Sequence, residues 1–164
     1  MKFLLAFIIG LVAAPLIFGI AAVAGLLPSN STAEPPKWES SLGMQALDSS
    51  LEKRSSGLKN PIADNDAGAF AAGAKIYSDN CSGCHGSAKG PSDWGDKGLY
   101  PRAPQFFQMG ADVTPPEAFA AIRDGIRYSG MGAWRNELKD DEMWKVANFV
   151  AKIRTSGGKK TDMD

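Results

Sequence analysis

The chain contains one C-x-x-C-H motif, Cys81-Ser82-Gly83-Cys84-His85. Two thiols at this spacing can each add to a vinyl group of one haem, and the histidine that follows can then donate a ring nitrogen to the iron. The chain has 2 cysteines and 1 histidine, and all of them lie in this motif. The motif therefore predicts one covalently bound haem c, attached through Cys81 and Cys84, with His85 as an axial ligand of the iron.

Three other uses of a C-x-x-C pair are weaker interpretations of the same residues. A thioredoxin-type redox pair is expected beside a βαβ unit, and no such pattern surrounds the motif. A structural zinc site needs four Cys or His ligands, whereas this chain contains three such residues. A disulfide between Cys81 and Cys84 is the remaining alternative. Haem attachment is the interpretation that uses both cysteines and the histidine.

The N-terminal part of the chain is long, apolar and uncharged. No charged residue occurs from Phe3 to Leu27, and Lys2 precedes this stretch. A membrane span needs about 20 apolar residues, whereas the apolar region of a cleaved signal peptide has about 7–15. The length therefore favours a transmembrane anchor over residues 1–27, with the membrane contacted by residues 3–27. The positive charge of Lys2 favours a cytoplasmic N-terminus, with the chain after Leu27 outside the cytoplasm.

A long signal peptide is the alternative to an anchor. Small residues that suit a signal peptidase occur at Ala22-Val23-Ala24 and at Ser31-Thr32-Ala33. Thioether attachment of haem takes place outside the cytoplasm in bacteria, so the haem motif requires an export signal of one kind or the other. We expect a single-pass protein of the bacterial inner membrane, with its haem domain on the periplasmic side.

Residues 28–61 have the composition of a periplasmic linker. Proline and small polar residues dominate positions 28–36, which is typical of an extended and water-exposed tether. Between Trp38 and Lys59, apolar residues recur at a weak helical spacing. This part is either a short helix that docks on another surface or a flexible linker.

Residues 62–155 are predicted to form one all-α domain. The spacing of apolar residues predicts helices over 66–80, from 115 towards Gly125, and over 139–154. The sequence Thr-Pro-Pro-Glu at 114–117 is a strong helix start, with a capping box and proline in the first turn. No run of alternating strand residues occurs. Residues 156–164 are expected to be a flexible tail.

Residues 62–153 resemble a class I c-type cytochrome, and the similarity covers the whole predicted domain. In that family, an N-terminal helix with a small residue one turn before an aromatic crosses the C-terminal helix near its aromatic residues. Gly73 and Tyr77 match the first helix, and Trp144 and Phe149 match the second. Because glycine has no side chain, the facing helix is expected to lie directly against its backbone. The resemblance implies the class I cytochrome c fold, with helices wrapped around the haem.

Further residues are expected to lie around the haem. In the family, a proline carbonyl accepts the second ring N–H of the axial histidine, which fixes the imidazole tautomer. Pro104 best fits that role, and Pro91 is the alternative. Arg102 is a candidate partner for a haem propionate, with an ordinary solvated arginine as the alternative. The indole N–H of Trp134 is a second candidate donor to a propionate.

The sixth iron ligand is expected to be a methionine thioether. The candidates that follow the haem motif are Met109, Met131 and Met143. In the family, the ligand lies in a Gly-Met-Pro-Ala-aromatic loop between the last two helices. Residues 130–134 stand in that place and read Gly-Met-Gly-Ala-Trp, with glycine where proline is usual. Met131 is therefore the predicted ligand and Met109 the alternative, while Met143 is expected to pack in the core.

These assignments predict an electron carrier rather than an enzyme. His85 and Met131 would fill both axial positions, and a thioether favours ferrous iron and raises the reduction potential. We expect a membrane-tethered one-electron carrier, alone or as the cytochrome subunit of a respiratory or dehydrogenase complex, with redox proteins as partners. A peroxidase-type haem enzyme with a displaceable sixth ligand is the alternative. The formal net charge is +0, so nucleic acid is not an expected partner.

Overall fold

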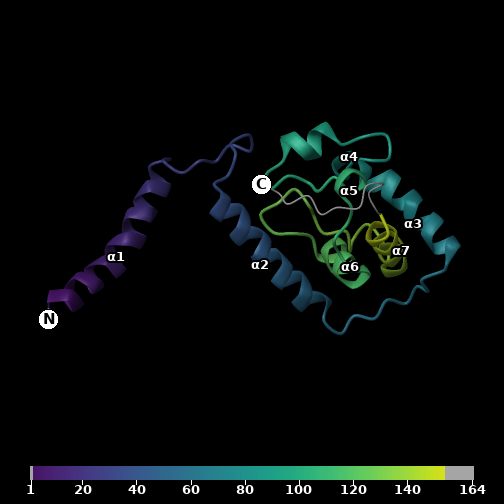
Figure 1. Ribbon diagram of the computed structural model, residues 1–164, viewed down its shortest axis with the longest axis horizontal. Helices are drawn as coiled ribbons and strands as arrows, with labels where there is room; N and C mark the ends of the chain where they lie inside the picture. The colour runs from purple at the N-terminus through teal and green to yellow at the C-terminus, as the bar shows by residue number, and fades with distance from the viewer. Residues whose placement is uncertain (1, 154–164) are drawn as a thin grey trace. The chain divides into compact units, whose positions relative to one another are not determined.

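The computed structural model describes residues 2–153, which form helices joined by loops (Figure 1). The helices in chain order are α1 (Lys2–Val23), α2 (Lys37–Ser55), α3 (Ala67–Asn80), α4 (Ser82–His85), the π-helix η1 (Trp94–Gly98), α5 (Phe106–Met109), α6 (Pro115–Asp124) and α7 (Asp140–Ala151). Within these described residues the only β-type pairing is an isolated bridge between Ser87 and Gly90. The predicted all-α fold is confirmed for this part of the chain. The tail predicted over residues 156–164 lies outside it.

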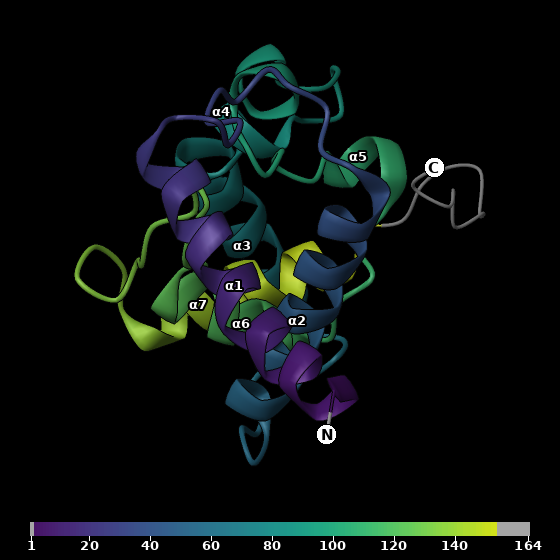
Figure 2. The same ribbon diagram turned by 90° about the vertical axis from the view of Figure 1, so that its left-hand side faces the viewer.

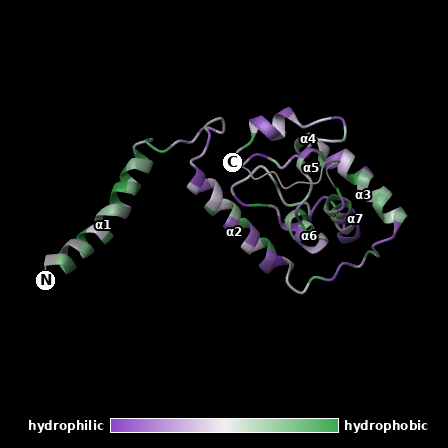
Figure 3. Ribbon diagram, in the orientation of Figure 1, coloured by the Kyte–Doolittle hydropathy of each residue, from purple (hydrophilic) through white to green (hydrophobic). Residues whose placement is uncertain are grey.

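The described part of the chain divides into two compact units between Ala33 and Glu34. The first unit contains α1, which is hydrophobic along its length (Figure 3) and whose large apolar side chains are exposed where they are described, as at Phe3, Phe7 and Ile17. In the part of the chain that the structure describes, no helix combines the length and the apolar character needed to cross a membrane. The anchor expected over residues 1–27 therefore stays a prediction.

The core of the second unit forms where α3 crosses α7 at close range. A Cβ atom placed on Gly73 would lie 2.2 Å from the carbonyl oxygen of Lys145, so the backbone of α7 rests directly on this glycine. Beside this contact, the rings of Tyr77 and Phe149 pack with their centroids 5.3 Å apart. The helix crossing predicted from Gly73 and the neighbouring aromatic residues is confirmed.

Helix α6 begins at the predicted capping sequence and packs against α7. The carboxylate of Glu117 accepts hydrogen bonds from the backbone N–H of Thr114 (2.8 Å) and from its hydroxyl group (2.7 Å). Phe119 of α6 stacks on Trp144 of α7 with ring centroids 4.1 Å apart. The Thr114–Glu117 pair thus fixes the start of α6. Aromatic stacking holds the buried face of α6 against α7.

Helix α7 ends earlier than the sequence predicts. The apolar spacing favoured a helix from 139 to 154, whereas α7 stops at Ala151 and Lys152 forms its C-cap. Ile153 leaves the helix and is buried, at 6% exposure. Its carbonyl accepts a hydrogen bond from the N–H of Ala111 (3.3 Å), so a loop takes the place of the last helical turn. Residue 154 lies outside the described residues.

Helix α2 belongs to the second unit and lies beside α6 (Figures 1 and 2). Its one buried residue is Leu51. After the helix, Asn60 exchanges two side-chain hydrogen bonds with the buried Asn148 of α7, at 2.8 and 2.9 Å. Of the two possibilities for residues 38–59, the structure contains the docked helix. The second compact unit includes this helix, and the cytochrome-like domain predicted from residue 62 onwards stays a prediction.

Candidate haem site

One helical turn carries the three residues of the haem motif. Helix α3 ends at Asn80, and the N–H of Cys81 still bonds to the carbonyl of Tyr77 (2.8 Å). The N–H groups of Cys84 and His85 then both donate to the carbonyl of Cys81, at 3.1 and 2.9 Å, which closes the turn of α4. Both cysteines are free thiols. The end of α3 therefore presents two thiols and an imidazole from a single turn.

The imidazole of His85 is held in one orientation by its neighbours. Its Nδ1 lies 3.0 Å from the carbonyl oxygen of Pro104. Because a carbonyl only accepts, Nδ1 carries the proton and Nε2 keeps its lone pair for a metal. Burial lowers the pKa of His85, and the bond to Pro104 opposes this effect only in part. Phe106 stacks on the ring, with centroids 4.8 Å apart, and so fixes its plane.

Pro104, rather than Pro91, is the proline that bonds to the histidine ring. Pro91 lies instead beside Gly86. A Cβ atom placed on Gly86 would be 3.1 Å from the Cα atom of Pro91. The loop that carries Pro104 is held in place by the N–H of Ala103, which donates to the carbonyl of Gly95 in η1 (2.9 Å). The carbonyl of Pro104 is thus presented to the ring by a tethered loop.

A buried glutamine, which no sequence pattern predicts, supports the motif. The side-chain nitrogen of Gln105 donates to the carbonyls of Cys84 (2.9 Å) and Ala103 (2.8 Å), and its oxygen accepts from the N–H of Ser92 (2.8 Å). Gln105 is 7% exposed, and both ends of its amide are used. It ties the haem turn to the loops on either side. No sequence pattern distinguishes a buried glutamine of this kind from one that is exposed to solvent.

Tyr77 supports the same turn from α3. Its hydroxyl group lies 3.1 Å from the carbonyl oxygen of His85 and 2.9 Å from that of Gly86, and donates to them. Burial, and then the neighbouring Cys81, raise the pKa of Tyr77 far above its ordinary value, so the hydroxyl stays a donor. Burial and the adjacent Cys84 likewise raise the pKa of the Cys81 thiol to about 12.

This donor set fits a covalently attached haem c. The thiols of Cys81 and Cys84 stand at the required spacing and are not joined to each other. The Nε2 atom of His85 is available because Pro104 occupies Nδ1. A neutral imidazole and two free thiols from one turn are what attachment and axial ligation need.

The family described as cytochrome c oxidase, cbb3-type, subunit III, matches residues 68–150. The chain belongs to this family of class I c-type cytochromes. The cytochrome therefore carries covalently bound haem c, and the predicted family and cofactor are confirmed. The matched range runs from α3 into α7, so it contains the haem motif and nearly all of both crossing helices.

Two solved structures are similar to part of the cytochrome. The reducing HAO-like protein complex of Kuenenia stuttgartiensis is 23% identical over 59% of this chain and 47% of that chain, with a TM-score of 0.48. Cytochrome CL from the marine methylotrophic bacterium Methylophaga aminisulfidivorans MPT is 27% identical over 53% of this chain and 54% of that chain, with a TM-score of 0.40. The cytochrome spans about half the length of each. No curated protein matches it.

The candidate methionines of the cytochrome lie in three different environments. Met143 is 0% exposed in the core face of α7, where it packs against other side chains. Met109 is the last residue of α5 and is 38% exposed. Met131 is partly buried in the loop between α6 and α7 and packs against the core. Met131 as the sixth ligand stays a prediction.

The two residues expected near the haem propionates have other contacts in the cytochrome. Arg102 forms an exposed ion pair with Glu34. Trp134 is partly buried against the core, and its backbone N–H donates to the carbonyl of Ile122 (3.0 Å). Their contacts with propionates stay predictions.

Proposed function

We propose that the cytochrome is a one-electron carrier in which His85 and Met131 are the two axial ligands. The observation that carries this proposal is the 3.0 Å contact between Nδ1 of His85 and the carbonyl of Pro104. This contact sets the tautomer in which Nε2 is free to bind iron. Bound haem c supplies a ferric/ferrous couple that takes up and releases one electron.

The roles proposed for the side chains are ligation and support. The thioether of Met131, as a soft donor, would favour the ferrous state and close the iron to small ligands. Phe106 and Gln105 keep the imidazole and the motif turn in one geometry. A ligand set that does not rearrange suits electron transfer, because little structural change then accompanies the change of oxidation state.

A redox titration and a ligand-binding assay test this function together. The purified cytochrome is expected to titrate as a single one-electron couple, and its ferrous form should not bind carbon monoxide. It should also fail to turn over hydrogen peroxide. Ready binding of carbon monoxide together with peroxide turnover would instead identify the peroxidase-type enzyme, whose sixth ligand leaves the iron.

We also propose that the carrier serves a respiratory or dehydrogenase electron-transfer chain, as a component or as a subunit of a complex. The support is the family, whose description is that of an oxidase subunit. Its partners would be a redox protein that reduces it and another that oxidises it. The docking contacts of such pairs are small and transient, so no extensive apolar patch is required.

We further propose that residues 1–27 tether the cytochrome to the bacterial inner membrane, with the haem domain on the periplasmic side. The support is the uncharged sequence from Phe3 to Leu27 and the exposure of the described apolar side chains of α1. The mature protein is expected to begin at or near Met1 and to stay with membranes until detergent is added. An N-terminus after Ala24 or Ala33, in a protein released by salt alone, would contradict the tether.

A further inference from the structure

Helix α2 lies outside the range that matches the cytochrome family and yet contacts the loop that carries Met131. The matched range begins at residue 68, whereas α2 ends at Ser55. The side chain of Arg54 reaches Gly125, the residue that caps the C-terminal end of α6, and α2 and α6 lie side by side in both views (Figures 1 and 2). The loop between α6 and α7 starts at that end.

The Met131 loop folds back on its own first residue. The N–H of Ile126 donates to the carbonyl of Met131 (2.9 Å), and the N–H of Trp134 donates to the carbonyl of Ile122 (3.0 Å). Gly125 has a φ of +70°, and a Cβ placed there would lie 2.9 Å from the carbonyl oxygen of Met131. Gly125 is therefore the residue against which the far side of the loop rests.

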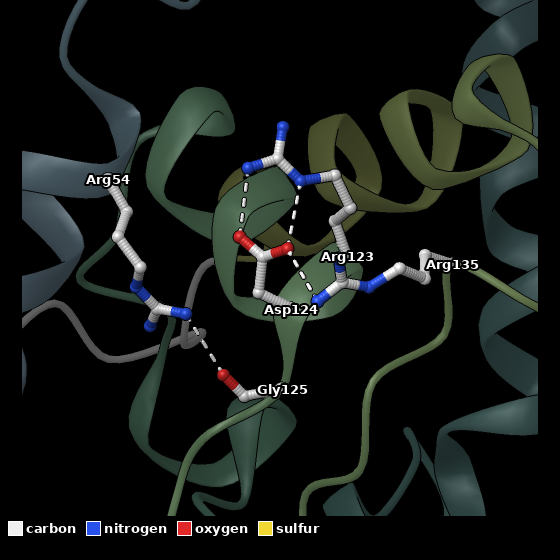
Figure 4. A network of polar contacts seen from close by, with 5 residues as sticks. All are labelled: Arg54, Arg123, Asp124, Gly125 and Arg135. Atoms are coloured by element: carbon white, nitrogen blue, oxygen red, sulfur yellow. Dashed lines mark hydrogen bonds and ion pairs between the residues drawn. The ribbon is translucent and has the colours of Figure 1, made fainter.

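An ion-pair network closes the same loop at its base (Figure 4). Arg123 donates to the two carboxylate oxygens of Asp124, at 3.1 and 2.8 Å. Arg135, from the far end of the loop, lies 3.3 Å from the same carboxylate. The hydrogen bond from Arg123 is the main cause of the lowered pKa of Asp124, which stays ionised. Asp124 thus joins the two ends of the loop.

Arg54 of α2 adds a contact from outside the loop. Its Nη1 donates to the carbonyl of Gly125 (3.0 Å), as Figure 4 shows. Its Nε is buried and finds no hydrogen-bond partner among the described residues. A guanidinium is buried with an unpaired N–H only where something offsets the loss of hydration. The visible compensation here is the bond to Gly125 and the nearby charge of Asp124.

Two polar contacts near the N-terminal end of residues 34–55 are exposed and weaker. Glu34 pairs with Arg102, and Glu39 accepts a hydrogen bond from the hydroxyl of Tyr100, both at the surface. Exposed ion pairs of this kind contribute little, because water and salt screen them. The contact of Arg54, which is partly buried and charge-assisted, is therefore expected to have a larger effect than these two exposed contacts.

We propose that Arg54 is a positioning residue that holds the Met131 loop closed on the haem. The proposal rests on the proposed ligation of iron by Met131. The guanidinium fixes the carbonyl of Gly125, and the backbone of Gly125 in turn supports the Met131 side of the loop. Without this contact the loop opens more often, and Met131 leaves the iron for a larger fraction of the time.

Competition by imidazole measures that fraction. Imidazole binds the ferric protein only when Met131 has left, so its apparent affinity rises with the population of the open loop. Arg54→Met is expected to raise this affinity about tenfold, because one charge-assisted hydrogen bond at the loop base is lost. The far-red charge-transfer band of the methionine-ligated ferric form should weaken in parallel. Lys53→Met removes the same charge from an exposed neighbour and should match the unmodified protein.

The possible results distinguish a positioning role for Arg54 from the ligation of iron by Met131. If Arg54→Met and Lys53→Met both bind imidazole as the unmodified protein does, Arg54 has no positioning role, although Met131 remains the ligand. If the unmodified protein lacks the far-red band, or Met131→Ala retains it, the ligand assignment itself is wrong and Arg54 loses its proposed role with it. Arg54→Gln, which is too short to reach Gly125, gives the same test should Arg54→Met lower the helix content measured by circular dichroism.

Discussion

Replacing both Cys81 and Cys84 with serine is expected to free the haem from the polypeptide. In the unmodified protein the haem should survive acid–acetone extraction and migrate with the chain on a denaturing gel, because thioether bonds resist both treatments. In the doubly substituted protein, His85 and Met131 alone would hold the haem. Coordination bonds of this kind are lost on denaturation, so all of the haem should pass into the organic phase.

The matched control is Ser82→Ala, which changes a residue between the two cysteines and removes only the bond from its hydroxyl to the carbonyl of Ser78 (2.8 Å). This variant should keep its haem on the gel. The doubly substituted protein should also be less stable, because a domain of this size depends on the haem for part of its apolar core. Quantitative extraction of haem from the unmodified protein would contradict covalent attachment.

The parts of the fold that the sequence predicted are those set by neighbours in the chain. The haem motif, the capping pair Thr114–Glu117 and the small residue Gly73 each depend on a few adjacent positions. Spacing or residue type alone is enough to identify such features. The family resemblance added Pro104, whose carbonyl lies 3.0 Å from the ring of His85 although 19 positions separate the two residues.

The parts that the sequence did not predict depend on polar contacts between distant segments. Arg54 reaches Gly125 across 71 positions, and Asn60 reaches Asn148 across 88. Gln105 bonds to backbone groups, which every residue of the chain possesses. None of these contacts leaves a periodic pattern in the sequence. For the same reason the sequence does not decide whether α2 docks, since Leu51 is its single buried residue.

The end of α7 shows how a local preference can be overridden. Apolar spacing continues to Ile153, and a helix that extended through it would have kept this side chain on the core face. In the structure the side chain of Ile153 is buried although its backbone is not helical. The carbonyl of Ile153 accepts a hydrogen bond from the N–H of Ala111. Burial and hydrogen bonding are therefore both satisfied without the last turn, and periodicity alone does not distinguish the two solutions.

Met131→Ala is expected to remove the sixth ligand and to change the redox chemistry of the protein. The far-red band of the ferric form should disappear, and the ferrous form should bind carbon monoxide. Loss of a thioether that favours ferrous iron should lower the reduction potential by on the order of 100 mV. For one electron this is roughly 2 kcal/mol, which is enough to disturb transfer between closely matched partners. A spectroelectrochemical titration measures the potential and the band together.

Met109→Ala is the matched control, because it truncates the same kind of side chain at the alternative candidate ligand. Met109 is 38% exposed at the end of α5, so its loss should leave the band and the potential unchanged and reduce packing only slightly. The opposite result, with the band lost in Met109→Ala and kept in Met131→Ala, would move the iron ligand to α5. The protein would then still be an electron carrier, but the loop closed by Asp124, Arg135 and Arg54 would no longer control the iron.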